Sequence, residues 1–287
     1  MSSIVLLTII SLSVIAIIAA VILYFVAQKF KVFEDPRIDE IQAVLPAANC
    51  GGCGFAGCRN FAEALVKADT FEGLNCPVGG AAIMGDAAKI LGKEAPFVEP
   101  QIAVLLCNGT PEFRLRTSFY NGANDCRIAH NLYVGDTDCS YGCLGLDDCV
   151  RACIFDAMYM DSVTGLPVIV DDKCVACGAC VKACPRNIIE LRKKARKDRK
   201  IYVACSNCDK GGPARRACKV ACIACSKCFK VCEFGAITIE NNLAYIDAAK
   251  CTFCRKCSPE CPTNSILEIN FPPRKPKVEV ITETVTG

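Results

Sequence analysis

The sequence predicts an α+β protein in which a transmembrane helix precedes three small cysteine-rich domains. The first 28 of its 287 residues carry no charged side chain, 25 residues are cysteine, and one four-cysteine spacing occurs three times. Domains this small have little apolar core, so bound metal would supply part of their stability. We expect a transmembrane anchor at 1–30, a small helical four-thiolate domain at 31–98, and two tandem related units at 99–200 and 201–287.

The N-terminal segment is long enough to cross a membrane. At about 1.5 Å per residue, the apolar stretch 3–28 exceeds the roughly 30 Å thickness of the hydrocarbon layer. No Lys or Arg precedes it, whereas Lys29 and Lys31 follow it, which is unlike a cleaved signal peptide. The positive-inside rule keeps the flank with these lysines in the cytoplasm. We therefore expect a single-pass protein of the cell inner (cytoplasmic) membrane, in contact with membrane lipid, with its cysteine-rich domains on the cytoplasmic side.

This location decides between two uses of so many cysteines. Disulfides are disfavoured in a reducing compartment, where thiolate ligands to metal persist. His130 is the only histidine, which excludes bis-His haem and Rieske centres and strains most histidine-dependent hydrolytic chemistry. We interpret His130 as a packed or surface residue and acid pairs such as Asp147-Asp148 as loop and capping residues. No catalytic residue is expected on this chain.

The charge distribution argues against nucleic acid as a partner. The net charge is +3, but the run 192–200 holds seven cations and one anion, so the rest of the chain sums to −3. We interpret this run as a solvated linker between domains, with a docking patch for an acidic partner or anionic lipid as the alternative. The glycine-rich segment 51–57 lacks the spacing of a dinucleotide fingerprint, and no phosphate-binding loop occurs, so we expect no bound nucleotide.

The first cysteine group lies in the domain at 31–98. Three cysteines fall within nine residues, with glycines that allow a tight turn, and a fourth returns later in the chain. The apolar spacing predicts a helix at 59–67, whose N-terminus would favour an anionic cluster. The sequence therefore predicts a cluster site, with structural zinc as the alternative, on Cys50, Cys53, Cys58 and Cys76.

The three copies of C-x2-C-x2-C-x3-C are typical of proteins with two 4Fe-4S clusters. Three cysteines of each copy hold one cubane, and the fourth reaches the cluster of a partner copy, so copies must come in pairs. The last two copies pair directly. This pairing predicts two clusters, one on Cys222, Cys225, Cys228 and Cys261, and one on Cys251, Cys254, Cys257 and Cys232.

The remaining copy, at 174–184, has an irregular partner at 139–153 with spacing x3, x5, x3. A widened loop would supply its first two ligands. Pro is absent after Cys153 and Cys232, which alters a turn but removes no ligand. The pairing predicts two more clusters, one on Cys139, Cys143, Cys149 and Cys184, and one on Cys174, Cys177, Cys180 and Cys153.

The two units repeat each other over a longer period. Strand-like segments precede Cys107 and Cys205, and each connector offers alternating short strands, as in the two-hairpin ferredoxin-like fold. Five clusters use 20 cysteines, and a sixth is possible on Cys107, Cys126, Cys205 and Cys218, with Cys208 to spare. A second alignment matches 218–222 with 139–143 and leaves Cys126 without a counterpart. Burial of free thiols is the other alternative.

Together these motifs resemble a known family. The apolar anchor, the segment LPAANCGGCGFAGCRNFAEA at 45–64, and the motifs CNGT, CSYGCLGLDDCVRAC and ACSNCDKGG are similar to the long B subunits of the Rnf complex. The resemblance implies a translocase, an ion-translocating ferredoxin:NAD oxidoreductase. Within it this subunit would accept electrons from soluble ferredoxin and relay them to other Rnf subunits that bind flavin and NAD.

Two other classes share part of the pattern. An iron-sulfur wire subunit of another membrane redox complex, linked to a hydrogenase or reducing a redox sensor, carries the same motifs. A zinc-binding structural module would use the same thiolates without redox activity.

Overall fold

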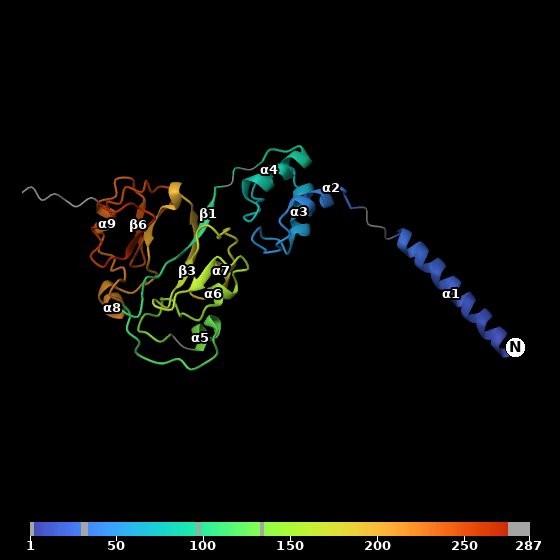
Figure 1. Cartoon of the computed structure of the whole chain (residues 1–287), viewed down its shortest axis with the longest axis horizontal. Coiled ribbons are helices and arrows are strands. Elements are labelled where there is room, and N and C mark those ends of the chain that lie inside the picture. Colours follow the sequence, from blue (N-terminus) through green and yellow to red (C-terminus); the bar gives the residue numbers. More distant parts are fainter. Residues whose placement is uncertain (1–2, 30–33, 96, 98, 133–134, 275–287) are drawn as a thin grey trace, which may run out of the picture.

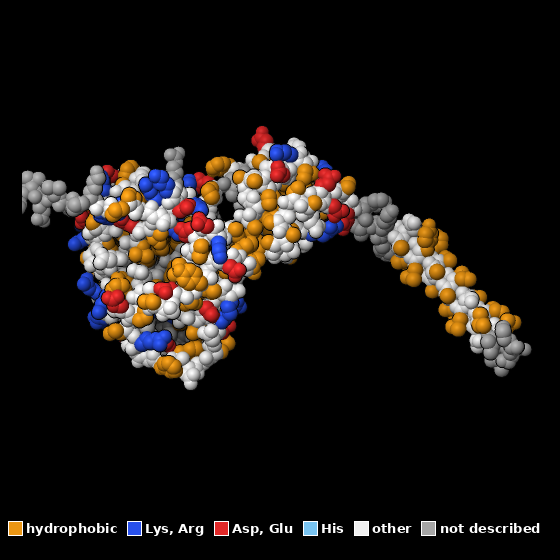
Figure 2. All heavy atoms as spheres, viewed as in Figure 1, with side chains coloured by type: hydrophobic (Ala, Val, Ile, Leu, Met, Phe, Trp, Pro, Cys, Tyr) orange, Lys and Arg blue, Asp and Glu red, His pale blue; other side chains and the backbone are white. Residues whose placement is uncertain are grey.

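The computed structural model begins with a single long helix that stands apart from the cysteine-rich domains (Figure 1). Helix α1 (Ser3–Lys29) is the one helix, among the residues described, that is long and apolar enough to cross a membrane. Figure 2 shows apolar side chains along its length, as expected for a surface that faces lipid. Lys31, used above for orientation, lies outside the described residues, which are 3–29, 34–95, 97, 99–132 and 135–274.

Three helices form the domain that follows. They are α2 (Arg37–Val44), α3 (Cys58–Lys67) and α4 (Gly80–Leu91). Their apolar faces meet in a core that includes Ile41, Phe61, Leu65 and Met84, all fully buried. The helix predicted at 59–67 is confirmed as α3.

The next unit contains two separate antiparallel pairs of strands. Strand β1 (Gln101–Leu105) pairs with β4 (Ile189–Lys193), and β2 (Met158–Met160) pairs with β3 (Pro167–Ile169). Three short helices lie between the strands: α5 (Cys126–Leu132), α6 (Asp148–Arg151) and α7 (Ala179–Ala183). His130 is exposed on α5, in keeping with its interpretation as a surface residue.

The last unit has the same topology, so the internal repeat is structural. Strand β5 (Lys200–Val203) pairs with β8 (Ile266–Ile269), and β6 (Ile237–Glu240) pairs with β7 (Leu243–Ile246). Helices α8 (Gly211–Ala217) and α9 (Lys227–Lys230) lie between β5 and β6. Cysteines make up five of the fourteen residues in its buried core, so apolar side chains alone do not fill it.

The basic run connects the two units and is largely structured. It spans the end of β4, the 3₁₀ turn η1 (Arg196–Asp198) and the start of β5. Arg192 and Lys200 are buried, and Lys200 donates to Asp171 at 2.6 Å. Arg192 donates to the Ile246 carbonyl of the last unit, and Asp171, which binds Lys200, belongs to the preceding unit. The interpretation of the run as a solvated linker is therefore wrong for these two residues, because each cation links the two units.

Candidate metal centres

The helical domain brings Cys76 next to the Cys50–Cys53 loop. Burial raises the pKa of the Cys76 thiol, and the nearby thiols of Cys53 and Cys50 add to the shift. The Gly79 amide donates to Cys76 Sγ at 3.4 Å. Cys58 opens α3, and its amide donates to Asn49 Oδ1 at 2.8 Å, which fixes the turn before the helix.

This first cysteine loop rests against the next unit. A Cβ at Gly52 would lie 2.9 Å from the Cys177 carbonyl oxygen and 2.9 Å from Pro77 Cγ, so only glycine allows this approach. The Lys182 ammonium reaches the Gly51 carbonyl at 3.5 Å. The thiol of Cys50 is near enough to Cys177 to raise its pKa, burial being the larger cause. Two predicted metal sites thus adjoin.

The four cysteines of the second predicted site lie around one cavity. One cavity is lined by Cys153, Cys174, Cys177 and Cys180, together with Ala103 and Leu191 from β1 and β4. Burial raises the pKa of Cys180 to about 11, and the thiols of Cys174, Cys177 and Cys153 contribute through repulsion between thiolates.

At the third predicted site, the structure brings three of the four predicted cysteines together with Cys126. Its cavity is lined by Cys126, Cys143, Cys149 and Cys184, and Cys139 is not among the lining residues. Burial raises the pKa of Cys149 to about 12, and the neighbouring thiols that add to this are Cys184, Cys126 and Cys180. Cys126, which sequence reasoning placed in another group, thus lies beside Cys143, Cys149 and Cys184.

A buried carboxylate holds Cys126 there. Asp148 is 8% exposed, and its Oδ2 accepts the Cys126 amide at 3.0 Å while its other oxygen pairs with Arg151. Asp147 is the residue before α6, with φ of 57°, and its side chain makes no capping hydrogen bond. The capping interpretation therefore holds for the position of this acid pair but misses the role of Asp148 in orienting a cysteine.

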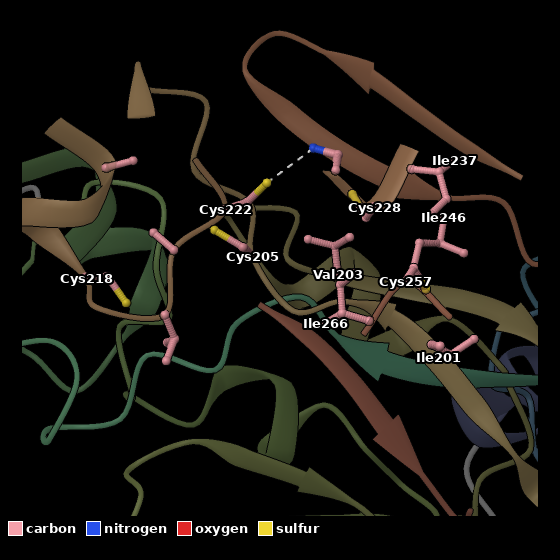
Figure 3. Close-up of a cluster of buried hydrophobic side chains, with 14 residues drawn as sticks. Ile201, Val203, Cys205, Cys218, Cys222, Cys228, Ile237, Ile246, Cys257 and Ile266 are labelled. Atoms are coloured by element: carbon pink, nitrogen blue, oxygen red, sulfur yellow. Dashed lines mark hydrogen bonds between the residues drawn. The ribbon is translucent and has the colours of Figure 1, made fainter. Parts of the chain in front are cut away.

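In the last unit, the cysteines of each predicted set lie near one another. Burial raises the pKa of Cys228 to about 11, and Cys222, Cys261 and Cys225 add to it. Burial alone would raise the pKa of Cys261, but hydrogen bonds from 263, 265 and 266 outweigh it and lower the pKa. Figure 3 shows Cys222 accepting the hydrogen bond from the Ala244 amide, 3.5 Å long. The other set lines its own cavity, which includes Cys232, Cys251, Cys254 and Cys257.

In the described residues, the thiols of these sets lie around cavities and do not converge on one point. In the described part of the chain, no three Cys, His, Asp or Glu side chains converge closely enough to hold one metal ion. The thiols instead surround cavities partly lined by apolar side chains. Burial and mutual repulsion raise the pKa of several of these thiols, and binding to a cationic metal centre would relieve both effects.

The fold and its cysteine sites define a membrane-anchored iron-sulfur protein with several centres. Three family models agree: a putative Fe-S cluster at residues 45–77, a 4Fe-4S binding domain at 167–190 and a 4Fe-4S dicluster domain at 221–265.

Comparison with curated proteins identifies the family within this class. The chain is 42% identical to the B subunit of the Na⁺-translocating ferredoxin:NAD⁺ oxidoreductase complex of Acetobacterium woodii, over 89% of this chain and 75% of that protein. It is 38% identical to the B subunit of the ion-translocating oxidoreductase complex of Methanosarcina acetivorans, over 93% and 99%. It is 39% identical to the B subunit of the proton-translocating ferredoxin:NAD⁺ oxidoreductase complex of Clostridium ljungdahlii, over 90% and 90%. The chain therefore belongs to the B subunit family of Rnf complexes, and it is an iron-sulfur electron-transfer subunit of such a complex.

Proposed function

We propose that this subunit holds a chain of at least five 4Fe-4S clusters between a soluble ferredoxin and the other Rnf subunits. Bound clusters of this kind supply transfer of single electrons at low potential. For four of the five clusters we propose the ligand sets expected from the sequence, and for the fifth we propose that Cys126 takes the place of Cys139. That fifth set is Cys126, Cys143, Cys149 and Cys184.

The observation that carries this proposal is that neighbouring sites lie close together, from the first to the third site and again within the last unit. The first site adjoins the second where Gly52 meets Cys177. Cys180 of the second site is among the thiols that raise the pKa of Cys149 in the third. In the last unit, burial raises the pKa of Cys257 to about 12, and the thiols of Cys251 and Cys228 add to the shift. Because Cys228 belongs to the other set, the two sites of the last unit also adjoin. Such a series suits the transfer of electrons along the chain.

The far end of this series has features that suit an acidic ferredoxin. Cys225 and Cys254 are exposed, unlike the other cysteines of their sites. Beside Cys225, α9 carries exposed Lys227 and Lys230, with the exposed ring of Phe229 between them. Cations around an exposed apolar residue would attract an acidic carrier and give it a surface to pack on. We propose that ferredoxin docks here.

The test uses the full chain, anaerobically purified with its iron, in lipid nanodiscs. Reduced ferredoxin should be oxidised rapidly, and added salt should slow the reaction. Changing Lys227 and Lys230 together to Glu should slow it about tenfold or more at low salt. The same changes at Lys67 and Lys89, which are exposed in the helical domain, are the control and should leave the rate unchanged.

Three results would contradict the proposal. A colourless protein containing zinc would favour the structural module. Equal rates for the two charge-reversed variants would place the docking surface elsewhere. NAD⁺ reduction by the isolated chain would give it a two-electron converter that its sequence lacks.

Membrane orientation needs a separate test. We propose that the single anchor leaves all cysteines on the cytoplasmic side, because Lys29 follows the apolar helix and no cation precedes it. A tag at Gly287 should then react only after cells are opened, and a tag at Met1 should react in intact spheroplasts. The reverse pattern would overturn the orientation.

A further inference from the structure

Four buried thiols outside the five sites gather where the two units meet. Cys107 and Cys139 come from the first unit, and Cys205 and Cys218 come from the second. Their exposed fractions are 9%, 5%, 9% and 6%. The thiols of Cys139 and Cys107 are near enough to Cys218 to raise its pKa, after burial, which is the larger cause. Four thiols that local motifs do not explain therefore share one buried region.

Short contacts across the interface support this grouping. Asn207, itself 1% exposed, directs its side-chain amide to Cys139 Sγ at 3.6 Å, while its backbone amide donates to Cys205 Sγ at 3.4 Å. A Cβ at Gly109 would lie 3.4 Å from Cys218 Sγ, and the Cys143 amide donates to Cys107 Sγ at 3.4 Å. Cys107, Cys139 and Cys205 are thus each met by an amide group, and Cys218 accepts a backbone hydrogen bond from Val220, as the sulfurs of bound clusters commonly do.

The internal repeat gives the four thiols a two-fold pattern. Cys107 follows β1 at the same distance as Cys205 follows β5, two residues after the last strand residue. Cys139 precedes Cys143 by four residues, as Cys218 precedes Cys222. The backbones also join at this point, because the Asn108 amide donates to the Ala204 carbonyl at 3.1 Å. Equivalent residues of the two units therefore supply equivalent thiols.

Two arginines accompany the thiols. The Arg114 guanidinium donates to the Cys143 carbonyl at 2.8 Å and approaches Gly142, beside Cys139. The Arg186 guanidinium reaches the Cys139 and Gly142 carbonyls. Placing two cations in a half-buried region is costly unless negative charge lies there. Four thiolates around a metal cluster would supply it.

We propose that Cys107, Cys139, Cys205 and Cys218 hold a further 4Fe-4S cluster shared between the two units. The inference rests on the proposed function, because it adds a site to the same series, between the third site and the first site of the last unit. It replaces the sequence-based sixth set, in which Cys126 stood where Cys139 now stands. In the view of Figure 3, Cys205 lies between Cys218 and Cys222, on the side facing the last unit's first site.

Iron counting on the full anaerobic chain tests the proposal. The wild-type chain should hold about 24 Fe, at four per cubane. Cys107→Ala and Cys218→Ala should each reduce this to about 20. Cys208→Ala is the matched control, since Cys208 lies close in sequence to Cys205 but belongs to no proposed set, and it should keep about 24.

Pairs of substitutions test which thiols share a cluster. Changing Cys107 and Cys139 together should remove about 4 Fe, because both serve one cluster. Changing Cys107 and Cys126 together should remove about 8 Fe, because they serve two. If the first pair removed about 8 Fe and the second about 4 Fe, the set containing Cys126 would be restored. An iron content unchanged by Cys107→Ala would mean that no such cluster forms.

The outcomes separate this inference from the proposed function. About 20 Fe in the wild-type chain, with normal ferredoxin oxidation, would overturn the inference alone. Iron far below 20, or clusters that ferredoxin does not reduce, would overturn the proposed function. Low-temperature EPR of each reduced variant shows whether the other clusters survive, so a variant that fails to fold is recognised. Loss of iron in Cys208→Ala but not in Cys205→Ala would overturn the assignment of Cys205 as a ligand of this cluster.

Discussion

Arg192 is expected to stabilise the packing of the two ferredoxin-like units. Its side chain is 5% exposed and donates to Glu190 Oε1 at 2.9 Å and to the Ile246 carbonyl of the other unit. The guanidinium also lies over the rings of Tyr202 and Tyr245, 6.0 and 5.2 Å from their centroids. Arg192→Met keeps the apolar stem and removes every one of these polar contacts.

The magnitude follows from those contacts. Two hydrogen bonds from a charged group contribute about 1.5 kcal/mol each, and two ring contacts about 0.5 kcal/mol each. Burial of the Met side chain recovers about 1.5 kcal/mol. Glu190 keeps the Tyr245 hydroxyl as a donor at 3.2 Å and is 26% exposed, so its carboxylate is not left unsolvated. The net loss of stability is about 2.5 kcal/mol.

The assay is the rate at which the visible absorption of the clusters bleaches in guanidinium chloride, measured anaerobically on the full chain. A rate is the appropriate quantity because cluster loss is irreversible. A loss of about 2.5 kcal/mol accelerates bleaching up to about 70-fold if the contact is already broken in the transition state for unfolding. The bleaching rate of Arg192→Lys should lie between those of wild type and Arg192→Met, because Lys keeps the positive charge but lacks the planar guanidinium group.

Lys193 provides the matched control. It is the next residue, is 44% exposed, and forms one surface ion pair with Glu99. Surface pairs of this kind contribute about 0 to 1 kcal/mol, so Lys193→Met should change the bleaching rate by no more than about fivefold. Equal bleaching of Arg192→Met and wild type would refute the role of Arg192. Slower ferredoxin oxidation in Lys193→Met, with salt dependence lost, would restore the basic run as a docking patch.

Three further predictions concern the sites themselves. Gly52→Ala should slow electron exchange between the helical domain and the next unit, because the added Cβ would push against the facing cysteine loop. Freeze-quench EPR measures this exchange, and the control Gly85→Ala, whose Cβ would lie in open space on α4, should leave the rate unchanged. Asp148→Ala removes the acceptor of the Cys126 amide and should cost about 4 Fe per chain on mild oxidation, whereas Asp86→Ala on the surface should cost none. Burial raises the pKa of four thiols from the ordinary value of 9.0 to about 12; they are the half-buried Cys143 and the buried Cys149, Cys205 and Cys257. The metal-free chain should therefore be most stable below about pH 9 and lose stability as the pH rises toward about 12; circular dichroism would show this loss, and an unchanged signal would refute it.

Local spacing was enough to predict those parts of the molecule that short segments determine. The helix at 59–67 and the strands before Cys107 and Cys205 follow from apolar periodicity within a few residues. The regular copies predict their own partners because the fourth cysteine always reaches the neighbouring site. Their grouping needs no knowledge of distant parts of the chain.

The position of Cys126 could not be predicted in this way. It lies 13 residues before Cys139 in a segment without a repeated spacing, and the contact that holds it comes from Asp148, 22 residues away. One signal was present, since matching 218–222 with 139–143 leaves Cys126 alone and therefore available for another site. Arg192 was obscured for a different reason. In a run of seven cations the composition suggests exposure to solvent, but Arg192 lies in β4 and its buried side chain donates to the Ile246 carbonyl of the other unit.

The distribution of cysteine in the core links the fold to its metal. In the last unit, Cys205, Cys218, Cys222, Cys228 and Cys257 occupy buried positions among Ile, Val and Ala side chains. A thiol is smaller than most of these neighbours and, without metal, leaves cavities that cost stability. With metal the same positions become the most strongly bonded part of the core, and burial that opposes the free thiolate then excludes water from the centre. Folding and metal binding are therefore coupled in each unit. Because the units meet at a region containing four such thiols, their relative position should depend on metal as well.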